Sequence, residues 1–178
     1  MIGVQSEVGV GSTFFLVLPV TPAPTPDSEQ QLPAHHHGQQ VLVIDPHDAS
    51  REQLRQLLTQ LHLVPTLCMD ANSTRSTLAK YEGQAPCAIL VASSLADAEA
   101  RELAQIFQQS PTLNSVPIVL LDSTAEPSRA QSSVFGRSTF QLAKPVRMRR
   151  LLSVLTQLLD TPHAAEMMPA EPDRLVIE

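Results

Sequence analysis

The chain has 178 residues, a formal net charge of -6 at pH 7 and a sequence pI near 5.4. This length leaves room for one domain of ordinary size with additional tails, and the acidic balance disfavours a nucleic-acid partner, whose phosphates attract basic surfaces. No apolar run approaches the roughly 18 residues that a membrane span needs, and the N-terminus lacks the cationic start and apolar block of a signal peptide. We therefore expect a cytoplasmic protein that makes no direct membrane contact through this chain.

The first 20 residues are predicted to form a β-hairpin. The turn Gly9-Val10-Gly11 precedes an apolar strand at residues 12–18, which stops at Pro19. A hairpin of this length cannot bury its own apolar face and would be only marginally stable alone.

Residues 2–15 and the later Leu18-Pro19 resemble the last hairpin of the ATP-binding domain of sensor histidine kinases. The resemblance implies that residues 1–20 are a remnant of that domain, and that the chain is a fragment of a hybrid histidine kinase. The motifs with which that family holds ATP would all lie upstream of Met1. We therefore expect that this chain does not bind ATP.

Two segments have the composition of linkers. Residues 21–40 contain four prolines, a histidine run and almost no apolar side chains, and residues 160–178 combine prolines with acidic residues. The run His35-His36-His37 could bind a transition metal, but three adjacent histidines without a carboxylate or cysteine nearby do not make a tetrahedral site. We therefore expect both segments to be solvated, the C-terminal one to be flexible, and the histidines to hold no metal.

Between these linkers, residues 41–159 alternate short apolar runs with segments of helical periodicity. The most informative run is residues 87–94, in which consecutive apolar residues stop abruptly at Ser93 and Ser94. Uninterrupted apolar strands are typical of parallel sheets that are buried on both faces. The predicted strands lie at residues 41–44, 64–69, 87–92, 118–121 and 139–143, and the predicted helices at 50–61, 72–81, from 97 onward, 127–135 and 148–158. The N-caps expected for the first two helices are Asp48 or Ser50, and Asn72 or Ser73.

Strand–helix units of this length indicate an α/β protein with a doubly wound, five-stranded parallel sheet. Right-handed crossovers on both faces give the flavodoxin-like strand order 2-1-3-4-5. In such a sheet, functional groups gather outside the carboxyl ends of the strands. We expect four strand-end residues to lie close together although they are far apart in the sequence. They are Asp45, Ala92, Asp122 and Lys144.

Three motifs connect this region with a known family: Val41-Leu42-Val43-Ile44-Asp45, Pro117-Ile118-Val119-Leu120-Leu121 and Lys144-Pro145. On these motifs, residues 41–159 resemble a receiver domain of two-component signalling. The resemblance implies the CheY-like form of the flavodoxin-like fold, in which an aspartate at the end of the third strand takes a phosphoryl group from a kinase histidine. That chemistry uses an acidic pair to hold Mg²⁺, a hydroxyl after the fourth strand, and a lysine.

The phosphorylation site that this resemblance implies is degenerate. Lys144 matches the family lysine and Asp45 matches the first acid of the pair, but Pro46 replaces the second acid. The acceptor position falls on Ala92, which has no nucleophilic atom, and the hydroxyl position falls on Asp122. We therefore expect no aspartyl phosphate, no bound metal ion, no cofactor and no enzymatic activity.

Lys144 would be an unpaired cation in a partly buried crevice unless a neighbouring carboxylate neutralised it. We predict an ion pair between Lys144 and either Asp122 or Asp45, in place of the family's contact between lysine and phosphate. By the same resemblance, the Lys144-Pro145 peptide bond is expected to be cis.

Three side chains near these strands are expected to belong to the core. Receivers usually place an aromatic switch residue three positions before the lysine, where this chain has Gln141. Phe140 lies on the opposite strand face and is expected to pack in the core. Cys68 and Cys87 fall in predicted strands, where a thiol usually serves as a small apolar side chain.

The favoured function is that of a pseudo-receiver, a non-enzymatic module of two-component (phosphorelay) signal transduction. It would dock on histidine kinases or other two-component proteins through the face of the fourth helix, fifth strand and fifth helix, and a homodimer is a further option. One alternative is a working phosphoacceptor receiver of a hybrid histidine kinase. Another is a small flavodoxin-like enzyme or flavin binder that uses Ser93 or Ser94, although the chain has no glycine-rich phosphate loop after its first strand.

Overall fold

The structure is a computed structural model that describes residues 1–21, 31–79, 85–123, 134–135 and 139–160. The chain divides into two compact units, Met1–Gln30 and Gln31–Glu178. Within the described ranges, no helix combines the length and the apolar character needed to cross a membrane.

The first unit contains the predicted antiparallel hairpin. Strands β1 (Ile2–Glu7) and β2 (Gly11–Leu16) pair along their whole length, and Gly9 turns the chain with a φ of +83°. Most of the apolar side chains stay open to solvent, and Phe14, for example, is 80% exposed. The hairpin therefore carries an apolar surface that it does not bury itself, as its length leads one to expect.

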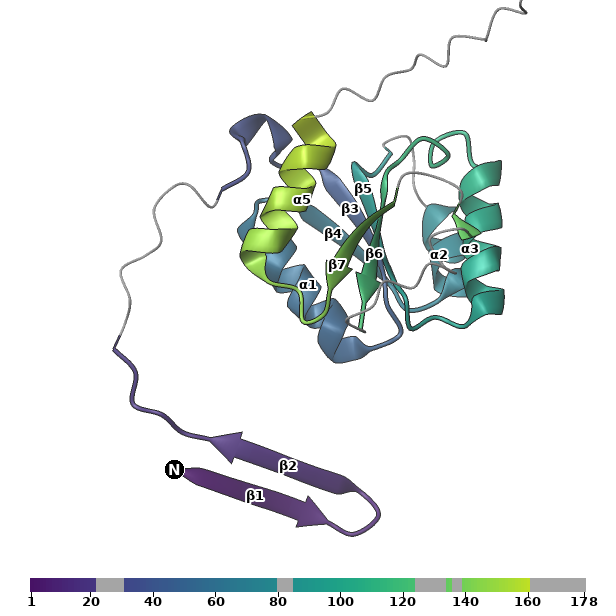
Figure 1. The fold of residues 1–178 in the computed structure, drawn as a ribbon. Coiled ribbons are helices and arrows are strands. Elements are labelled where there is room, and N and C mark those ends of the chain that lie inside the picture. The colour runs from purple at the N-terminus through teal and green to yellow at the C-terminus, as the bar shows by residue number, and fades with distance from the viewer. Residues whose placement is uncertain (22–30, 80–84, 124–133, 136–138, 161–178) are drawn as a thin grey trace, which may run out of the picture. The chain divides into compact units, whose positions relative to one another are not determined.

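The second unit is built on a five-stranded sheet (Figure 1). Its strand order is β4-β3-β5-β6-β7, and every neighbouring pair is parallel. Counted along this unit, the order is 2-1-3-4-5, which confirms the predicted flavodoxin-like topology. The strands are β3 (Gln40–Ile44), β4 (Val64–Cys68), β5 (Ala88–Ala92), β6 (Ile118–Asp122) and β7 (Thr139–Ala143).

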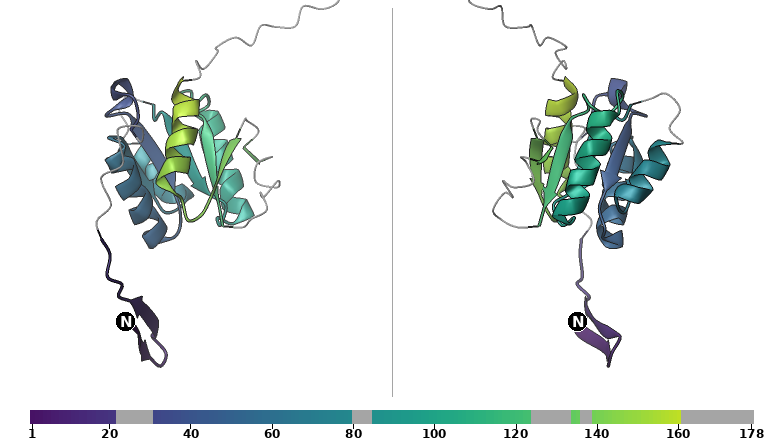
Figure 2. Two further views of the ribbon diagram at one scale, coloured as in Figure 1. Left: turned by 60° about the vertical axis from the view of Figure 1, so that its left-hand side comes forward. Right: turned by 90° about the vertical axis from the view of Figure 1, so that its right-hand side faces the viewer.

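Helices cover both faces of this sheet (Figures 1 and 2). α1 and α5 lie on one face, and α2 and α3 lie on the other. Each face has its own cluster of buried apolar side chains, and the central strand β5 contributes to both because all of its residues are buried. The helices are α1 (Asp48–Gln60), α2 (Ala71–Leu78), α3 (Asp97–Gln109) and α5 (Met148–Asp160). The predicted helix at residues 127–135 falls almost entirely outside the described residues.

The N-terminus of α2 is held by a capping box. The Asp70 carboxylate accepts a hydrogen bond of 2.6 Å from the Ser73 N–H, and the Ser73 hydroxyl accepts one of 3.1 Å from the Asp70 N–H. The N-cap is therefore Asp70, and the prediction of Asn72 or Ser73 as the cap is wrong. Ser73 is the third helical residue, from which its side chain reaches back to complete the box.

The chain joins the second unit earlier than its composition suggested. Residues 31–39, here called the lead-in segment, include the 3-10 helix η2 (Ala34–His36). Leu32 is 2% exposed within the core cluster that α1 and α5 share, and His36 is also buried. The predicted solvated linker at residues 21–40, with the domain starting at 41, is therefore wrong for this segment. One leucine and three histidines produce no periodic apolar pattern, so this segment could not be predicted from hydrophobic periodicity.

The core residues predicted near the sheet lie where they were expected. Cys68 is buried, Cys87 is partly buried, and both are free thiols. Burial raises the pKa of the Cys87 thiol to about 11. Phe140 packs against the core cluster of α1 and α5, whereas Gln141 is exposed on the other face of β7.

Candidate functional site at the strand ends

The parallel sheet brings four strand ends together on one side of the domain, as predicted. β3 lies beside β5, β5 beside β6 and β6 beside β7. Hydrogen bonds connect these ends: the Lys144 N–H donates to the Asp122 carbonyl at 2.6 Å, and the Ser93 N–H donates to the Leu121 carbonyl at 2.9 Å. The backbone at the candidate site is therefore held together across adjacent strands.

Asp45 is the centre of this site. It follows β3 directly, and its side chain is 0% exposed. The carboxylate accepts a hydrogen bond of 3.0 Å from the His47 N–H and one of 2.6 Å from the Ser50 hydroxyl, and it also accepts one from the Lys144 ammonium. The Arg51 guanidinium donates to the Asp45 backbone carbonyl at 2.5 Å. Every polar group of this buried residue thus has a protein partner, since its N–H donates to the Cys68 carbonyl.

The surroundings of Asp45 keep its carboxyl group ionised. Burial by itself raises its pKa, but the hydrogen bonds from Lys144, Ser50 and the His47 backbone, together with the charge of Lys144, outweigh that effect. The pKa of Asp45 therefore lies below its ordinary value of 3.8. His47 also places Nδ1 at 3.4 Å from Asp45 Oδ1, but its side chain is 66% exposed.

Lys144 forms the predicted internal ion pair, and Asp45 is its partner. The lysine side chain is only 15% exposed, so both charges are largely removed from water. The Lys144-Pro145 peptide bond is cis, as predicted. The ammonium group of Lys144 lies against the Asp45 carboxylate at the end of β3.

Ala92 ends β5 with a side chain that is 1% exposed. Next to it, the Ser93 hydroxyl donates to Asp122 Oδ1 at 3.0 Å, and Asp122 itself is 7% exposed. The central strand therefore ends in a buried methyl group, which has no nucleophilic atom. The neighbouring polar groups of Ser93 and Asp122 are engaged with one another.

These residues do not fit a magnesium ion. Mg²⁺ demands near-octahedral oxygen ligands and is usually bound through one or two carboxylates. Here Pro46 and Ala92 offer no side-chain oxygen, Asp122 Oδ1 accepts a hydrogen bond from Ser93, and both carboxylate oxygens of Asp45 already accept hydrogen bonds. The Lys144 ammonium supplies the positive charge that a metal ion would otherwise bring to Asp45.

Ser50 has a different role from the one that its place in the sequence predicts. It was expected, with Asp48, to cap the first helix, but α1 has His47 as its N-cap and no side-chain cap hydrogen bond. Ser50 donates to Asp45 instead, because the first turn of α1 lies directly over the end of β3. A hydroxyl one helical turn after a strand-end acid is the signal that could have identified it.

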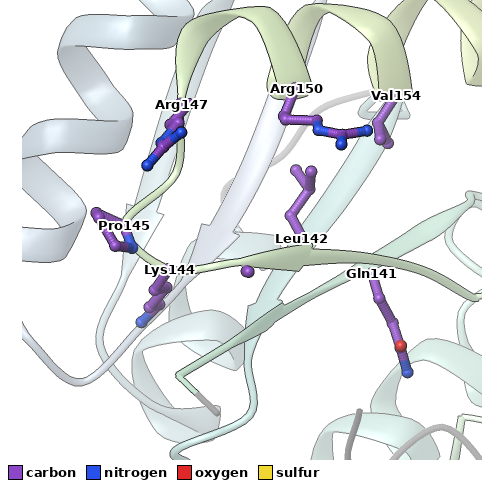
Figure 3. A pocket seen from close by; sticks show the side chains of 8 residues that line it. Gln141, Leu142, Lys144, Pro145, Arg147, Arg150 and Val154 are labelled. Atoms are coloured by element: carbon purple, nitrogen blue, oxygen red, sulfur yellow. The ribbon is translucent and has the colours of Figure 1, made fainter. Parts of the chain in front are cut away.

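A groove runs beside this site between β7 and α5 (Figure 3). It has a volume of about 430 Å³, and Lys144, Pro145, Arg147, Arg150 and Val154 are among the residues that line it. Arg147 and Arg150 are exposed, and Figure 3 shows both at the α5 side of the groove. The described part of this face is therefore cationic, although the chain as a whole is acidic.

The fold and its strand-end site define a flavodoxin-like α/β domain of the kind found in receivers, and comparison with solved structures gives the same class. No family model and no curated protein matches the sequence. The signal receiver domain of a histidine kinase from Syntrophus aciditrophicus matches with a TM-score of 0.58 at 17% identity, over 74% of this chain and 97% of that chain. The signal receiver domain of an HD-domain-containing protein from Pseudomonas fluorescens matches with a TM-score of 0.55 at 25% identity, over 69% of this chain and 88% of that chain.

A third similar structure is the receiver domain of a sensor histidine kinase from Pseudomonas aeruginosa, which has a magnesium ion coordinated in its active-site cleft. It matches with a TM-score of 0.57 at 22% identity, over 68% of this chain and 98% of that chain. Similarities of this extent show that the chain has the CheY-like fold of receiver domains.

Proposed function

We propose that the chain is a pseudo-receiver, a non-enzymatic module of two-component signal transduction that acts by docking on partner proteins without aspartyl phosphorylation. The observation that carries this proposal is the state of the strand-end site. Ala92 occupies the acceptor position, and Lys144 already neutralises the buried Asp45. Without an acceptor carboxylate and a metal ion, the site lacks the groups needed for phosphoryl transfer and for a conformational switch driven by phosphorylation.

The groove between β7 and α5 supports docking as the mode of action. Arg147 and Arg150 at its side would attract acidic groups on a partner, and the apolar lining from Pro145 and Val154 would add contact area. Histidine kinases and other two-component proteins are the partner class that the receiver fold suggests. A second copy of this chain is a further candidate.

The hairpin in the first unit supports a place within a hybrid histidine kinase. Its sequence resembles the last hairpin of a kinase ATP-binding domain, and its strands pair as an antiparallel hairpin should. Its exposed apolar residues would suit a larger sheet that covers them. On this proposal, residues 1–20 close the kinase domain, the receiver-like domain follows it, and the protein works in the cytoplasm.

Incubation with acetyl phosphate and Mg²⁺, followed by intact mass measurement, tests this function. We expect the wild-type chain to gain no phosphate, while a functional receiver domain treated in parallel gains one. A stable gain of one phosphate would overturn the proposal and favour a working receiver. The variants Asp45→Asn and Asp122→Asn would then show which carboxylate accepts it. A purified protein that absorbs visible light would instead favour a flavin binder.

A further inference from the structure

The lead-in segment and the last turn of α5 meet at one end of the domain, where Figure 1 shows the turn containing η2 beside the end of that helix. His36 Nε2 lies 3.1 Å from Asp160 Oδ1, although 124 positions separate the two residues. The sequence places no carboxylate beside the histidine run. The fold brings the Asp160 carboxylate to it.

Three side chains at this junction are arranged as metal ligands would be. His35, His36 and Asp160 each offer one ligand atom, and these atoms all lie within 4.8 Å of one another. The two imidazole rings are already close, with centroids 3.9 Å apart and planes tilted by 50°. Small side-chain adjustments would bring three ligand atoms around one ion, because His35 and Asp160 are exposed and not enclosed by the core.

Burial fixes the His36 ring at this junction. The residue is only 5% exposed, and its Nε2 atom faces Asp160, whereas Nδ1 on the other edge of the ring has no hydrogen-bond partner among the described residues. Nε2 is therefore the atom that His36 offers to an ion shared with Asp160. The neighbouring His37 differs in this respect, since its Nε2 lies 3.1 Å from the Leu32 carbonyl and its ring contacts His62.

We propose that His35, His36 and Asp160 bind one divalent transition-metal ion, with Zn²⁺ the best match. Two imidazole nitrogens and one carboxylate oxygen suit Zn²⁺, and a water molecule would complete a four-coordinate site. The ion would fasten the lead-in segment to the end of α5.

Titration of the untagged protein with ZnCl₂ in a calorimeter tests this site. We expect wild type to bind one Zn²⁺ ion per chain and to melt at a higher temperature when the ion is present. His35→Ala and Asp160→Asn should each weaken binding by about 10- to 100-fold or more, the loss seen when even a supporting partner of a metal ligand is removed. Both residues are exposed, so these variants should fold, and circular dichroism verifies that they do.

His37→Ala is the matched control, because it removes a histidine from the same run but not from the proposed site. Its Zn²⁺ affinity should equal that of wild type. The proposal fails if wild type binds no Zn²⁺, or if His35→Ala and Asp160→Asn bind it as well as wild type does. It also fails if His37→Ala weakens binding as much as His35→Ala, since the run would then capture metal through any of its histidines.

Discussion

Replacing Lys144 by methionine should destabilise the domain strongly, because it leaves the Asp45 carboxylate buried without a counter-ion. Asp45 is 0% exposed, and Lys144 supplies one of three side-chain or backbone donors that reach its carboxylate. Breaking a buried ion pair by removing one partner costs about 3–5 kcal/mol. Lys144 is itself 15% exposed, so we expect the lower end, about 3 kcal/mol, or a melting temperature lower by about 10 °C.

Urea unfolding of Lys144→Met measures this loss directly. Arg149→Met is the matched control, since it removes an exposed cation from α5 and should change the free energy of unfolding by about 0.5 kcal/mol or less. The double variant Asp45→Asn with Lys144→Met should recover part of the loss, because the orphaned charge is gone. If Lys144→Met unfolds like Arg149→Met, the ion pair does not stabilise the buried site and the reasoning is refuted.

Three further predictions concern single side chains. The pKa of Asp45 is lowered in the folded state, so its contribution to stability is present above its ordinary pKa of 3.8 and is lost as the pH falls through the lower pKa of the folded state. The difference in free energy of unfolding between wild type and Lys144→Met should therefore shrink below about pH 4. A constant difference from pH 7 to pH 3 would contradict this prediction. Asp70→Ala should lower the free energy of unfolding by about 1 kcal/mol because it removes the α2 cap, whereas Asn72→Ala should change it little. Equal losses in the two variants would argue against the observed capping box. With a pKa of about 11, only about one in a thousand Cys87 side chains should be thiolate at pH 8. Cys87 in the native protein should therefore react slowly with a thiol reagent. Reaction as fast as that of the protein unfolded in urea would show that the thiol is accessible to solvent.

The sheet topology could be predicted from the sequence because each strand is an apolar run and each crossover is short. These local signals fix a parallel sheet, and the sheet alone brings Asp45, Ala92, Asp122 and Lys144 to one edge. The existence of the ion pair also followed, since a buried cation needs a partner. The sequence could not predict which acid pairs with Lys144, because the choice between Asp45 and Asp122 depends on side-chain directions at the ends of different strands.

The contacts that the sequence did not reveal are long-range or lack periodicity. His36 meets Asp160 across 124 positions, and no local pattern links them. Leu32 is a single apolar residue among polar neighbours, so its burial could not be read from composition. Ser50 had two uses open to it, as a helix cap or as a donor to Asp45, and only the position of α1 over β3 decides between them.

The most direct test of the proposed pseudo-receiver function is to introduce the groups that the receiver resemblance implies at this site and to compare phosphate gain with that of wild type. The triple variant Pro46→Asp, Ala92→Asp and Asp122→Thr supplies the second acid, the acceptor and the hydroxyl, and it keeps Lys144. With acetyl phosphate and Mg²⁺, intact mass should show one added phosphate on the triple variant and none on wild type. Phosphate on the wild-type chain would contradict the account, and an unmodified but folded triple variant would show that these three positions are not what the site lacks.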